Sequence, residues 1–415
     1  MDMGSKILYN DRFLAGTLGP ETEMLGPVED GGSIVFNTAP GCWGPMITPV
    51  IRDGHECNIP VAVEGAEVGD SILIKIKKIV ITSKASSSGT HRFIRERSEK
   101  CPNCGEVWPE VIVEGTGLEA IKCAKCGSPA SPYSVTHGYT MIFDDDRAVG
   151  LTVNTEINEI ISNDASSWGA IPRNSRQVSS LIANQSDIPG LVSRVIPFMG
   201  QLGTIPSIDI PSTNNSGDSS AYYESRKNLT DGHMDIDSVR EGSMLVCPVK
   251  VKGGGIYAGD MHAQQGDGEI AGHTTDVSGE VTVEVSVIKN LTMEGPLLFP
   301  VVEDLPPLAR PFTEEERCTV KAYSRQLGIE LEPNAPVQVV GSGLSINEAV
   351  DDGLKKASNL FGMTLEEVKN RATITGGIEI GRLPGLVHIT LKVPTSTLKK
   401  LGLIDVVKEQ YHQYF

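Results

Sequence analysis

Two pairs of cysteines constrain this chain more than any other feature of its sequence. Each pair is separated by two residues and followed by a glycine, in the order Cys101, Cys104, Cys123 and Cys126. Each pair brings two thiolates near one point, and the glycine allows a tight turn, so the four sulfurs close a tetrahedral zinc site. Because the protein fills all four positions, no place remains for water and the metal is structural. We predict a zinc ribbon, with a redox dithiol or an iron–sulfur site as the alternative.

The rest of the sequence is typical of a strand-rich fold. Its 44 glycines and 25 prolines exceed average usage and imply many turns. Apolar residues alternate with polar ones in residues 71–77, 280–288 and 387–393, as in half-buried strands. Capping residues and helical spacing predict a helix over 346–361 and a second helix beginning at Thr364. The predicted fold is α+β and strand-rich, a mixed β-sandwich-like core with a C-terminal helix pair and the inserted zinc ribbon.

Shifts in composition suggest four parts of the chain. A polar, serine-rich stretch precedes the cysteines, and ordinary composition returns near residue 135, so the ribbon reads as an insertion between two strands. We therefore predict an N-terminal β part of the core (1–84), the ribbon (85–135), a central β core with long loops (136–300) and a C-terminal α/β part (301–415).

Charge and hydropathy narrow the possible partners and location. The chain has 36 Lys and Arg against 53 Asp and Glu, a net charge of −17, which repels nucleic acid. No secretion signal or membrane-length apolar run is evident, so we predict a cytoplasmic protein that binds no membrane. In that compartment the remaining four cysteines are expected to be reduced and buried thiols, namely Cys42, Cys57, Cys247 and Cys318.

Residues 259–273 carry the second cluster of reactive side chains. In a strand, Asp260 and His262 point to the same face, so a carboxylate and an imidazole converge as a divalent cation such as zinc requires. Glycines beyond them allow a turn that returns Glu269 to the same place, and residues 231–237 offer a further ligand. A solvated loop is the alternative interpretation, but apolar neighbours suggest that these charges lie near a core and need a partner.

These same residues carry a resemblance to a known family. Residues 259–269 resemble the signature GD-x-H-A-x-Q-G-D-G-E of the acetamidase/formamidase family. Residues 63–70 resemble the V-E-G-A-E-P-G-D element of that family, with Val68 in place of proline. Residues 232–235 are similar to its G-N-M-D segment, with His233 where asparagine is usual.

The resemblance extends to the C-terminal helix pair and closing strands (343–394), but not to the cysteine insertion or to residues 153–230. It implies hydrolysis of a small primary amide to carboxylate and ammonia at a metal-bearing site. Carried over to matching positions, it places at the site Asp235, Asp260, His262 and Glu269, with Glu64 as a weaker candidate.

We therefore predict a metal-dependent hydrolase of linear amides of the formamide or acetamide type. Zinc or another divalent metal would polarise the carbonyl and lower the pKa of a bound water from about 15.7 to about 7. The predicted ligands are Asp235, Asp260 and His262. Glu269, with Glu64 as the second candidate, is the predicted catalytic residue, which takes the proton of the water and passes it to ammonia.

Three alternatives remain open at this point. The same site could act on a cyclic or larger amide, or the protein could be a non-catalytic zinc-ribbon scaffold. Cys42, in a glycine-flanked turn, is a runner-up nucleophile for which no nearby base can be named.

Because the family members are typically dimeric or larger, the resemblance also implies a homodimer or higher homo-oligomer, with a small amide as the ligand.

Overall fold

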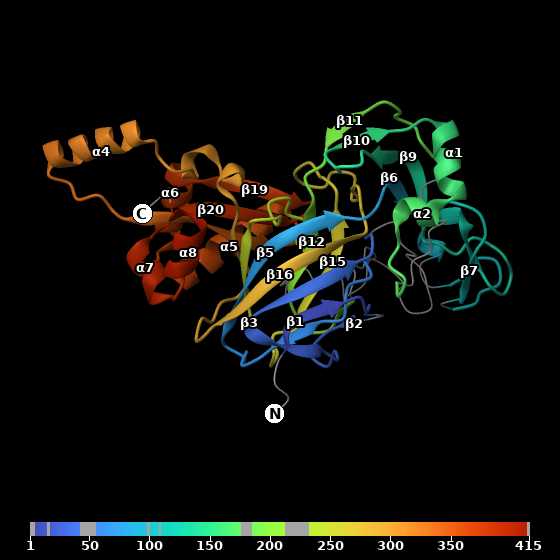
Figure 1. The fold of residues 1–415 in the computed structure, drawn as a ribbon, viewed down its shortest axis with the longest axis horizontal. Helices are drawn as coiled ribbons and strands as arrows, with labels where there is room; N and C mark the ends of the chain where they lie inside the picture. Colours follow the sequence, from blue (N-terminus) through green and yellow to red (C-terminus); the bar gives the residue numbers. More distant parts are fainter. Residues whose placement is uncertain are drawn as a thin grey trace.

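The structure is a computed structural model that describes residues 5–14, 17–41, 55–97, 100–107, 109–175, 185–211 and 232–412. Within these residues the protein is strand-rich α+β, with a large sheet in the middle and helices at both ends (Figure 1). The predicted fold class is therefore confirmed.

The main sheet is mixed and has 12 strands in the described ranges. Strand β3 pairs in parallel with β1 and with β4, whereas the pairs around β16 and β20 are antiparallel. The strand β1 (Ser5–Asn10) pairs with β3, off the main path of the sheet. The other strands follow in the order β12 (Phe198–Thr204), β15 (Ile256–His262), β4 (Val61–Val63), β3 (Leu25–Thr38), β16 (Gly279–Ile288), β5 (Ser71–Ile81), β14 (Met244–Pro248), β17 (Leu297–Phe299), β18 (Asn334–Ser342), β20 (Leu386–Pro394) and β19 (Gly377–Arg382).

The first hydrophobic core lies around the central strands of this sheet. The alternation predicted from the sequence is present in β16. Val283 and Val285 are buried, and Glu284 between them is partly exposed. Val283 lies opposite Ile34 of β3, and Val285 lies opposite Ile74 of β5. Each such apolar side chain contributes about 1.5–3 kcal/mol when it is removed from water, so these cross-strand pairs fix the register.

A second core joins the C-terminal helices to β18 and β20. Helix α5 (Ile346–Phe361) begins at Ser345, whose side chain accepts a hydrogen bond from the Glu348 N–H, and ends at Gly362 with φ 64°. Helix α6 (Leu365–Thr375) begins at Thr364 in the same way. Both helices contact β20, and α7 (Thr395–Lys400) and α8 (Ile404–Gln410) follow it. The helix pair predicted from the sequence is confirmed.

A smaller, four-stranded sheet carries the cysteine segment at the other end of the molecule (Figure 1). Its order is β11 (Val192–Arg194), β10 (Val149–Thr152), β9 (Tyr133–Phe143) and β6 (Ala85–Phe93). The cysteines lie between β6 and β9, where β7 (Val111–Val113) pairs with β8 (Ile121–Cys123). Helices α1 (Thr155–Asn163) and α2 (Ala165–Gly169) follow β10, and β2 (Thr17–Leu18) pairs separately with β13 (Ile210–Pro211). This sheet therefore continues past residue 135, the predicted end of the insertion.

One helix stands apart from both cores. Helix α4 (Glu314–Leu327) projects from the C-terminal part of the molecule on two connecting segments (Figure 1). Among the helices of the described ranges, none is both long and apolar enough to cross a membrane.

Candidate metal centre and active site

Buried imidazole and carboxylate side chains meet where β15 ends. The cluster contains His55, His233, Asp235, Asp260, His262 and Asp276, with the guanidinium of Arg382 at one side. All seven residues are at most 5% exposed. Three of them, Asp235, Asp260 and His262, are the metal ligands predicted from the sequence, and the structure brings them together.

Asp260 lies at the middle of the cluster and joins two groups of potential ligands. Its Oδ2 is 3.3 Å from His55 Nε2 and 3.4 Å from His233 Nε2. Its Oδ1 is 3.1 Å from His262 Nε2, which in turn is 4.0 Å from Asp235 Oδ1. The ligand atoms of His55, His233 and Asp260 lie within 4.8 Å of one another, as do those of Asp235, Asp260 and His262. One carboxylate thus belongs to two triads.

The backbone comes unusually close to these carboxylates. A Cβ atom on Gly200 would lie 2.6 Å from Asp235 Oδ1 and 2.8 Å from Asp260 Oδ2. A Cβ atom on Gly41 would likewise collide with Asp260 Oδ1 and would lie 2.8 Å from His55 Nδ1. Both positions accept only glycine, because a side chain would fill the space beside the carboxylates.

Asp235 is held in place from two sides. The Met234 and Asp235 N–H groups donate to Gly200 O of β12 at 2.9 and 3.2 Å, which ties this segment to the sheet. Arg382 Nη1 lies 2.8 Å from Asp235 Oδ2 and 2.9 Å from His233 Nε2. Arg382 therefore compensates part of the negative charge of the cluster and orients both neighbours.

Gln265 connects His262 to the same framework. Its Oε1 lies 3.2 Å from His262 Nδ1, and its Nε2 donates to Asp235 O at 2.8 Å and to Gly381 O at 3.1 Å. Because the amide nitrogen already donates to two carbonyls, Oε1 accepts a hydrogen bond from His262 Nδ1–H. That hydrogen bond directs the second ring nitrogen, Nε2, toward Asp260, where it could bind a cation once it has given up its proton.

Burial and charge set opposite protonation states within the cluster. Burial lowers the pKa of His55 to about 4, although Asp260 opposes this change. Burial alone would also lower the pKa of His262, but Asp260, Asp276 and Asp235 outweigh it and raise the pKa to about 10. Burial would raise the pKa of Asp260, yet His55 and His262 hold it well below its usual range. The central carboxylate is therefore ionised, as a metal ligand must be.

Glu269 lies in a turn that faces this cluster. Its φ is 44°, and its carbonyl accepts the Gly272 N–H at 2.7 Å. Gly268 fixes the turn to β19, because its N–H donates to Ile380 O at 3.1 Å and its carbonyl accepts the Leu383 N–H at 2.9 Å. Burial raises the pKa of Glu269 well above its usual range, and Asp235 raises it further. Such a group is suited to accepting a proton and returning it.

The structure does not bring Glu64 to this site. Glu64 is exposed in the turn after β4, which pairs with β15 at Ile256, the end of β15 remote from His262. The element that contains Glu64 has a structural role instead. Its last residue, Asp70, accepts hydrogen bonds from the Glu67 and Asn290 N–H groups at 3.0 and 2.9 Å. The runner-up nucleophile Cys42 lies outside the described residues.

Four members of the cluster were not assigned to the site from the sequence, namely His55, His233, Asp276 and Arg382. His55 reaches it because Asn58 N–H donates to Ala258 O at 2.8 Å, which lays this segment beside β15. Asp276 arrives because the chain returns antiparallel to β15, with His262 and Asp276 paired. Arg382 ends β19. No spacing in the sequence links these residues to Asp260, and His55 stood out only as a histidine two residues before Cys57.

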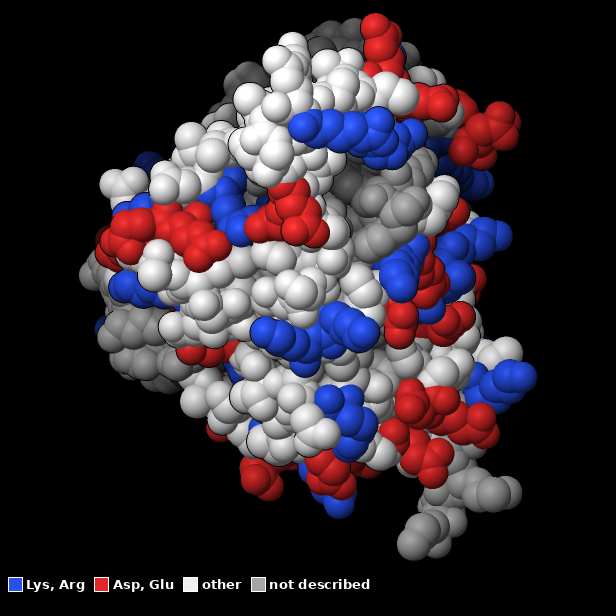
Figure 2. Space-filling model, turned by 90° about the vertical axis from the view of Figure 1, so that its left-hand side faces the viewer, with Lys and Arg blue, Asp and Glu red and all other residues white. Residues whose placement is uncertain are grey.

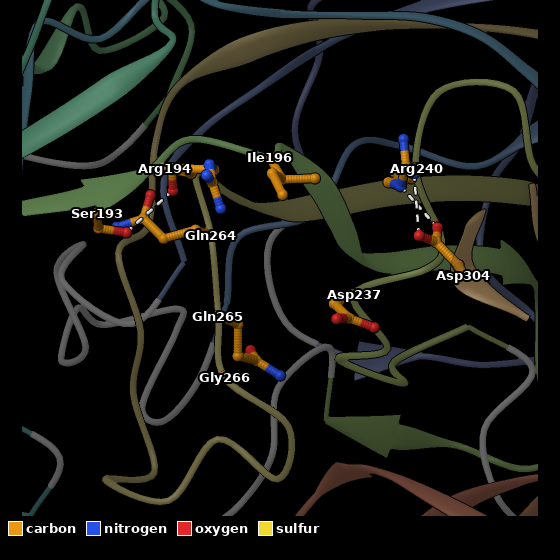
Figure 3. Close-up of a pocket in the computed structure, with 9 residues that line it drawn as sticks. All are labelled: Ser193, Arg194, Ile196, Asp237, Arg240, Gln264, Gln265, Gly266 and Asp304. Atoms are coloured by element: carbon orange, nitrogen blue, oxygen red, sulfur yellow. Dashed lines mark hydrogen bonds and ion pairs between the residues drawn. The ribbon is translucent and has the colours of Figure 1, made fainter. Parts of the chain in front are cut away.

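A pocket of about 380 Å³ opens beside the cluster (Figure 3). Gln264, Gln265 and Gly266 form one part of its wall. On the opposite side Arg240 and Asp304 form an ion pair, with Arg240 Nε 2.6 Å from Asp304 Oδ2, as the dashed lines in Figure 3 show. Gln265 lines the pocket and also contacts His262, so this residue connects the pocket wall to the cluster.

The four clustered cysteines form a separate site. Cys101 Sγ lies 3.5 Å from Cys126 Sγ, and Cys104 Sγ lies 3.8 Å from Cys123 Sγ. Zn–S bonds of about 2.3 Å would set tetrahedral sulfurs about 3.8 Å apart, whereas a disulfide needs about 2.05 Å. A hydrogen bond from the Asn103 side chain and others from Ser128 lower the pKa of Cys126 to about 6, which favours its thiolate. The geometry fits a four-thiolate metal site.

The buried cluster also fits a metal. Asp260 Oδ1 and His262 Nε2 are buried without a hydrogen bond of good geometry in the described structure, although only 3.1 Å apart. Ionised carboxylates in such a place are costly unless cations compensate them. Without a metal, Arg382 and a protonated His262 would supply that charge, and a metal would take the place of the His262 proton. Mixed imidazole and carboxylate donors suit zinc and similar dications.

Together, the fold and the site define a class: strand-rich α+β proteins with a buried imidazole–carboxylate centre. Residues 42–230 and 224–400 match the profile of the Acetamidase/Formamidase family, and the chain belongs to that family. The resemblance noted in the sequence is therefore confirmed, and the matched range also includes the cysteine insertion and residues 153–230, to which it was not expected to extend.

Curated relatives match over parts of their length. The formamidase of Methylophilus methylotrophus is 33% identical over 98 residues, 23% of this chain and 24% of that protein. The acetamidase of Mycolicibacterium smegmatis is 26% identical over 246 residues, 57% of this chain and 54% of that protein. The chain thus spans about a quarter to about a half of these relatives.

Solved structures match over nearly the whole chain. A predicted acetamidase/formamidase from Thermoanaerobacter tengcongensis is 18% identical with a TM-score of 0.55, and covers 96% of this chain and 98% of its own. An acetamidase from Bacillus halodurans is 17% identical with a TM-score of 0.53, and covers 95% and 99%. At these identities the comparison shows a shared fold.

Proposed function

We propose that the protein is a metal-dependent amidohydrolase that cleaves a small linear amide, of the formamide or acetamide type, to a carboxylate and ammonia. The family supports the reaction class, since its curated members carry the names formamidase and acetamidase. The observation that carries the metal requirement is the shared carboxylate Asp260, which belongs to two buried ligand triads.

The ligand set is larger than the sequence predicts. His55 and His233 would hold one ion with Asp260, and Asp235 and His262 would hold a second ion with the same carboxylate. Asp276 Oδ1, 3.2 Å from His262 Nε2, would join the second set. When bound, such ions would polarise the amide carbonyl and lower the pKa of a water.

The remaining steps belong to residues of the chain. Glu269 would accept the proton of the attacking water and deliver it to the leaving nitrogen, because burial and Asp235 bring its pKa up from the usual carboxylate range. Arg382 would hold Asp235 and His233 in place through their 2.8 and 2.9 Å contacts. Gln265 would hold His262 in the required tautomer.

A second candidate substrate is favoured by one observation. The pocket beside Gln265 has a volume of about 380 Å³, which is within the range of pockets that bind molecules larger than formamide. A cyclic or longer amide on the same site therefore belongs in any substrate screen.

We propose a structural zinc at the four cysteines, supported by their 3.5 and 3.8 Å sulfur separations.

We also propose the four-part division of the chain at residues 84, 135 and 300, and a homo-oligomeric assembly. We propose a cytoplasmic location as well, which is supported by the finding that no cysteine of the described residues forms a disulfide.

The test is an ammonia-release assay over formamide, acetamide, longer amides and lactams, run on protein stripped of metal and then reloaded. We expect activity only after reloading, with formamide or acetamide preferred. If fully reloaded protein releases no ammonia from any short amide, the proposed reaction is wrong.

A further inference from the structure

The segment that brings Asp276 to the buried cluster is bonded to β15 along one edge. The Val277 N–H donates to Met261 O at 2.8 Å, and Asp276 pairs with His262. These contacts bring Asp276 Oδ1 to 3.2 Å from His262 Nε2. In a trans peptide the carbonyl points away from the following N–H, so the Asp276 carbonyl faces away from β15.

A buried serine of the smaller, cysteine-bearing sheet meets that carbonyl. Ser86 is the second residue of β6, and its Oγ donates to Asp276 O at 2.5 Å. Three residues earlier in the chain, Ser83 Oγ accepts the Ser278 N–H at 2.8 Å. The peptide group between Asp276 and Val277 is therefore clamped between β15 on one side and the start of β6 on the other.

This clamp lies where β5 of the main sheet continues into β6 of the smaller sheet (Figure 1). Ser86 and Asp276 are both buried, and the hydrogen bond between them is buried as well. The C-terminal end of the molecule is different, because its surface mixes acidic and basic groups (Figure 2). Salt screens such surface charges but not a buried hydrogen bond, so the contribution of Ser86 can be measured at a salt concentration that screens them.

We propose that Ser86 is a positioning residue, which holds the carboxylate of Asp276 against His262 by fixing the backbone of Asp276. Strand β6, which leads into the four cysteines, thereby helps to determine how tightly the buried cluster binds a metal. This role of Ser86 depends on the proposed metal centre, but not on which amide the protein hydrolyses.

The surroundings of His262 explain why the backbone of Asp276 needs such a restraint. Carboxylate oxygens of Asp260, Asp276 and Asp235 lie 3.1, 3.2 and 4.0 Å from His262 Nε2. Like charges at these separations repel one another, so a carboxylate on a loosely held segment would move away. Zinc–oxygen bonds of about 2.0–2.2 Å tolerate little displacement. Groups that orient a ligand typically contribute about 10- to 100-fold in metal affinity, and we expect Ser86 to contribute about 10-fold because it acts through the backbone.

The test is a competitive chelator titration of the zinc-loaded, full-length protein, with thermal unfolding to show that each variant is folded. Ser86→Ala should weaken zinc binding at the buried cluster by about 10-fold while the zinc at the cysteines is retained. Ser86→Thr keeps the hydroxyl and should keep the affinity of the unaltered chain. In the Asp276→Asn background, Ser86→Ala should cause no further loss, because Ser86 acts through that carboxylate.

Ser88 provides a matched control on the same strand. Ser86 and Ser88 are two residues apart and lie on the same face of β6. Ser88 is also fully buried, and its Oγ has no hydrogen-bond partner among the residues that the structure describes. Ser88→Ala therefore removes a buried hydroxyl without breaking a hydrogen bond, and should leave the affinity for zinc unchanged at both sites.

Unchanged affinity at the cluster in Ser86→Ala would overturn the role of Ser86 and leave the proposed function intact. An equal loss in Ser88→Ala or in Ser86→Thr would overturn it as well, since the hydrogen bond to Asp276 would then not be the cause. The same holds for a full further loss in the Asp276→Asn background. If the unaltered chain binds zinc only at the cysteines, the proposed metal centre is wrong and the role of Ser86 falls with it.

Discussion

Replacing Gln265 with methionine should weaken metal binding at the proposed centre although no ligand is removed. The substitution keeps the side-chain volume but removes the acceptor 3.2 Å from His262 Nδ1, so His262 is free to rotate and to change tautomer. Loss of such an orienting contact typically costs 10- to 100-fold in metal affinity, or about 1.4–2.7 kcal/mol. The same change also removes the donor to Asp235 O and Gly381 O, which should lower the free energy of unfolding by about 1–3 kcal/mol.

The assay is a competitive chelator titration of the zinc-loaded protein, with thermal unfolding to show that the variant is folded. The neighbouring residue provides a matched control, because Gln264 contacts Thr275 Oγ1 at 3.1 Å and not His262. Gln264→Met should keep the unaltered metal affinity. Unchanged affinity in Gln265→Met, or an equal loss in both variants, would refute the role assigned to Gln265.

Three further results are expected. Glu269→Gln should retain its metal, while its turnover falls by about 10²–10⁴-fold. His262→Ala, in contrast, should lose the metal. Near-normal ammonia release from Glu269→Gln would exclude Glu269 as the base. Mild chelation should abolish activity before it removes the ribbon metal. Cys101→Ser should make the ribbon the first part of the chain that a protease cleaves. Simultaneous loss of both metals would contradict two separate sites. Asp70→Asn should lower the free energy of unfolding by about 1–2 kcal/mol at pH 7. Burial would raise the pKa of Asp70, but hydrogen bonds from Lys289 and two backbone N–H groups lower it, so its contribution is full above about pH 4 and is lost as pH falls through the folded pKa. When the free energy of unfolding is measured by fluorescence over an acid pH series, it should change less with pH in the variant than in the unaltered chain.

Local patterns explain what could be predicted from this sequence. The helix over 346–361 depends on Ser345 and Gly362, which act within a few residues of its ends. The thiolate cluster depends on two tight turns, in which the Gly105 and Gly127 N–H groups donate to Cys101 O and Cys123 O at 2.9 and 2.8 Å. Such features need no knowledge of the rest of the fold.

The missing members of the cluster depend on long-range pairing. His55 and Asp260 are separated by about two hundred residues and meet only because Asn58 pairs with Ala258 beside β15. Arg382 is still further along the chain and is placed by the pairing of β19 with β20 and by the bridge between Gly268 and Arg382. Neither register can be read from a single sequence, because each depends on the order of strands in the completed sheet.

The backbone conformation at the site differs from the regular strand that the prediction assumed. The sequence argument placed Asp260 and His262 on one face because it assumed a regular strand, but Asp260 has φ 51° and leaves the regular alternation. Asp235 has the same φ, and Glu269 has φ 44°. A non-glycine residue in this region costs roughly 1–3 kcal/mol and persists only where the surroundings impose it. Three of the four residues proposed from the family signature have this conformation within one buried cluster, so the surrounding contacts, and not local preference, hold these carboxylates in place.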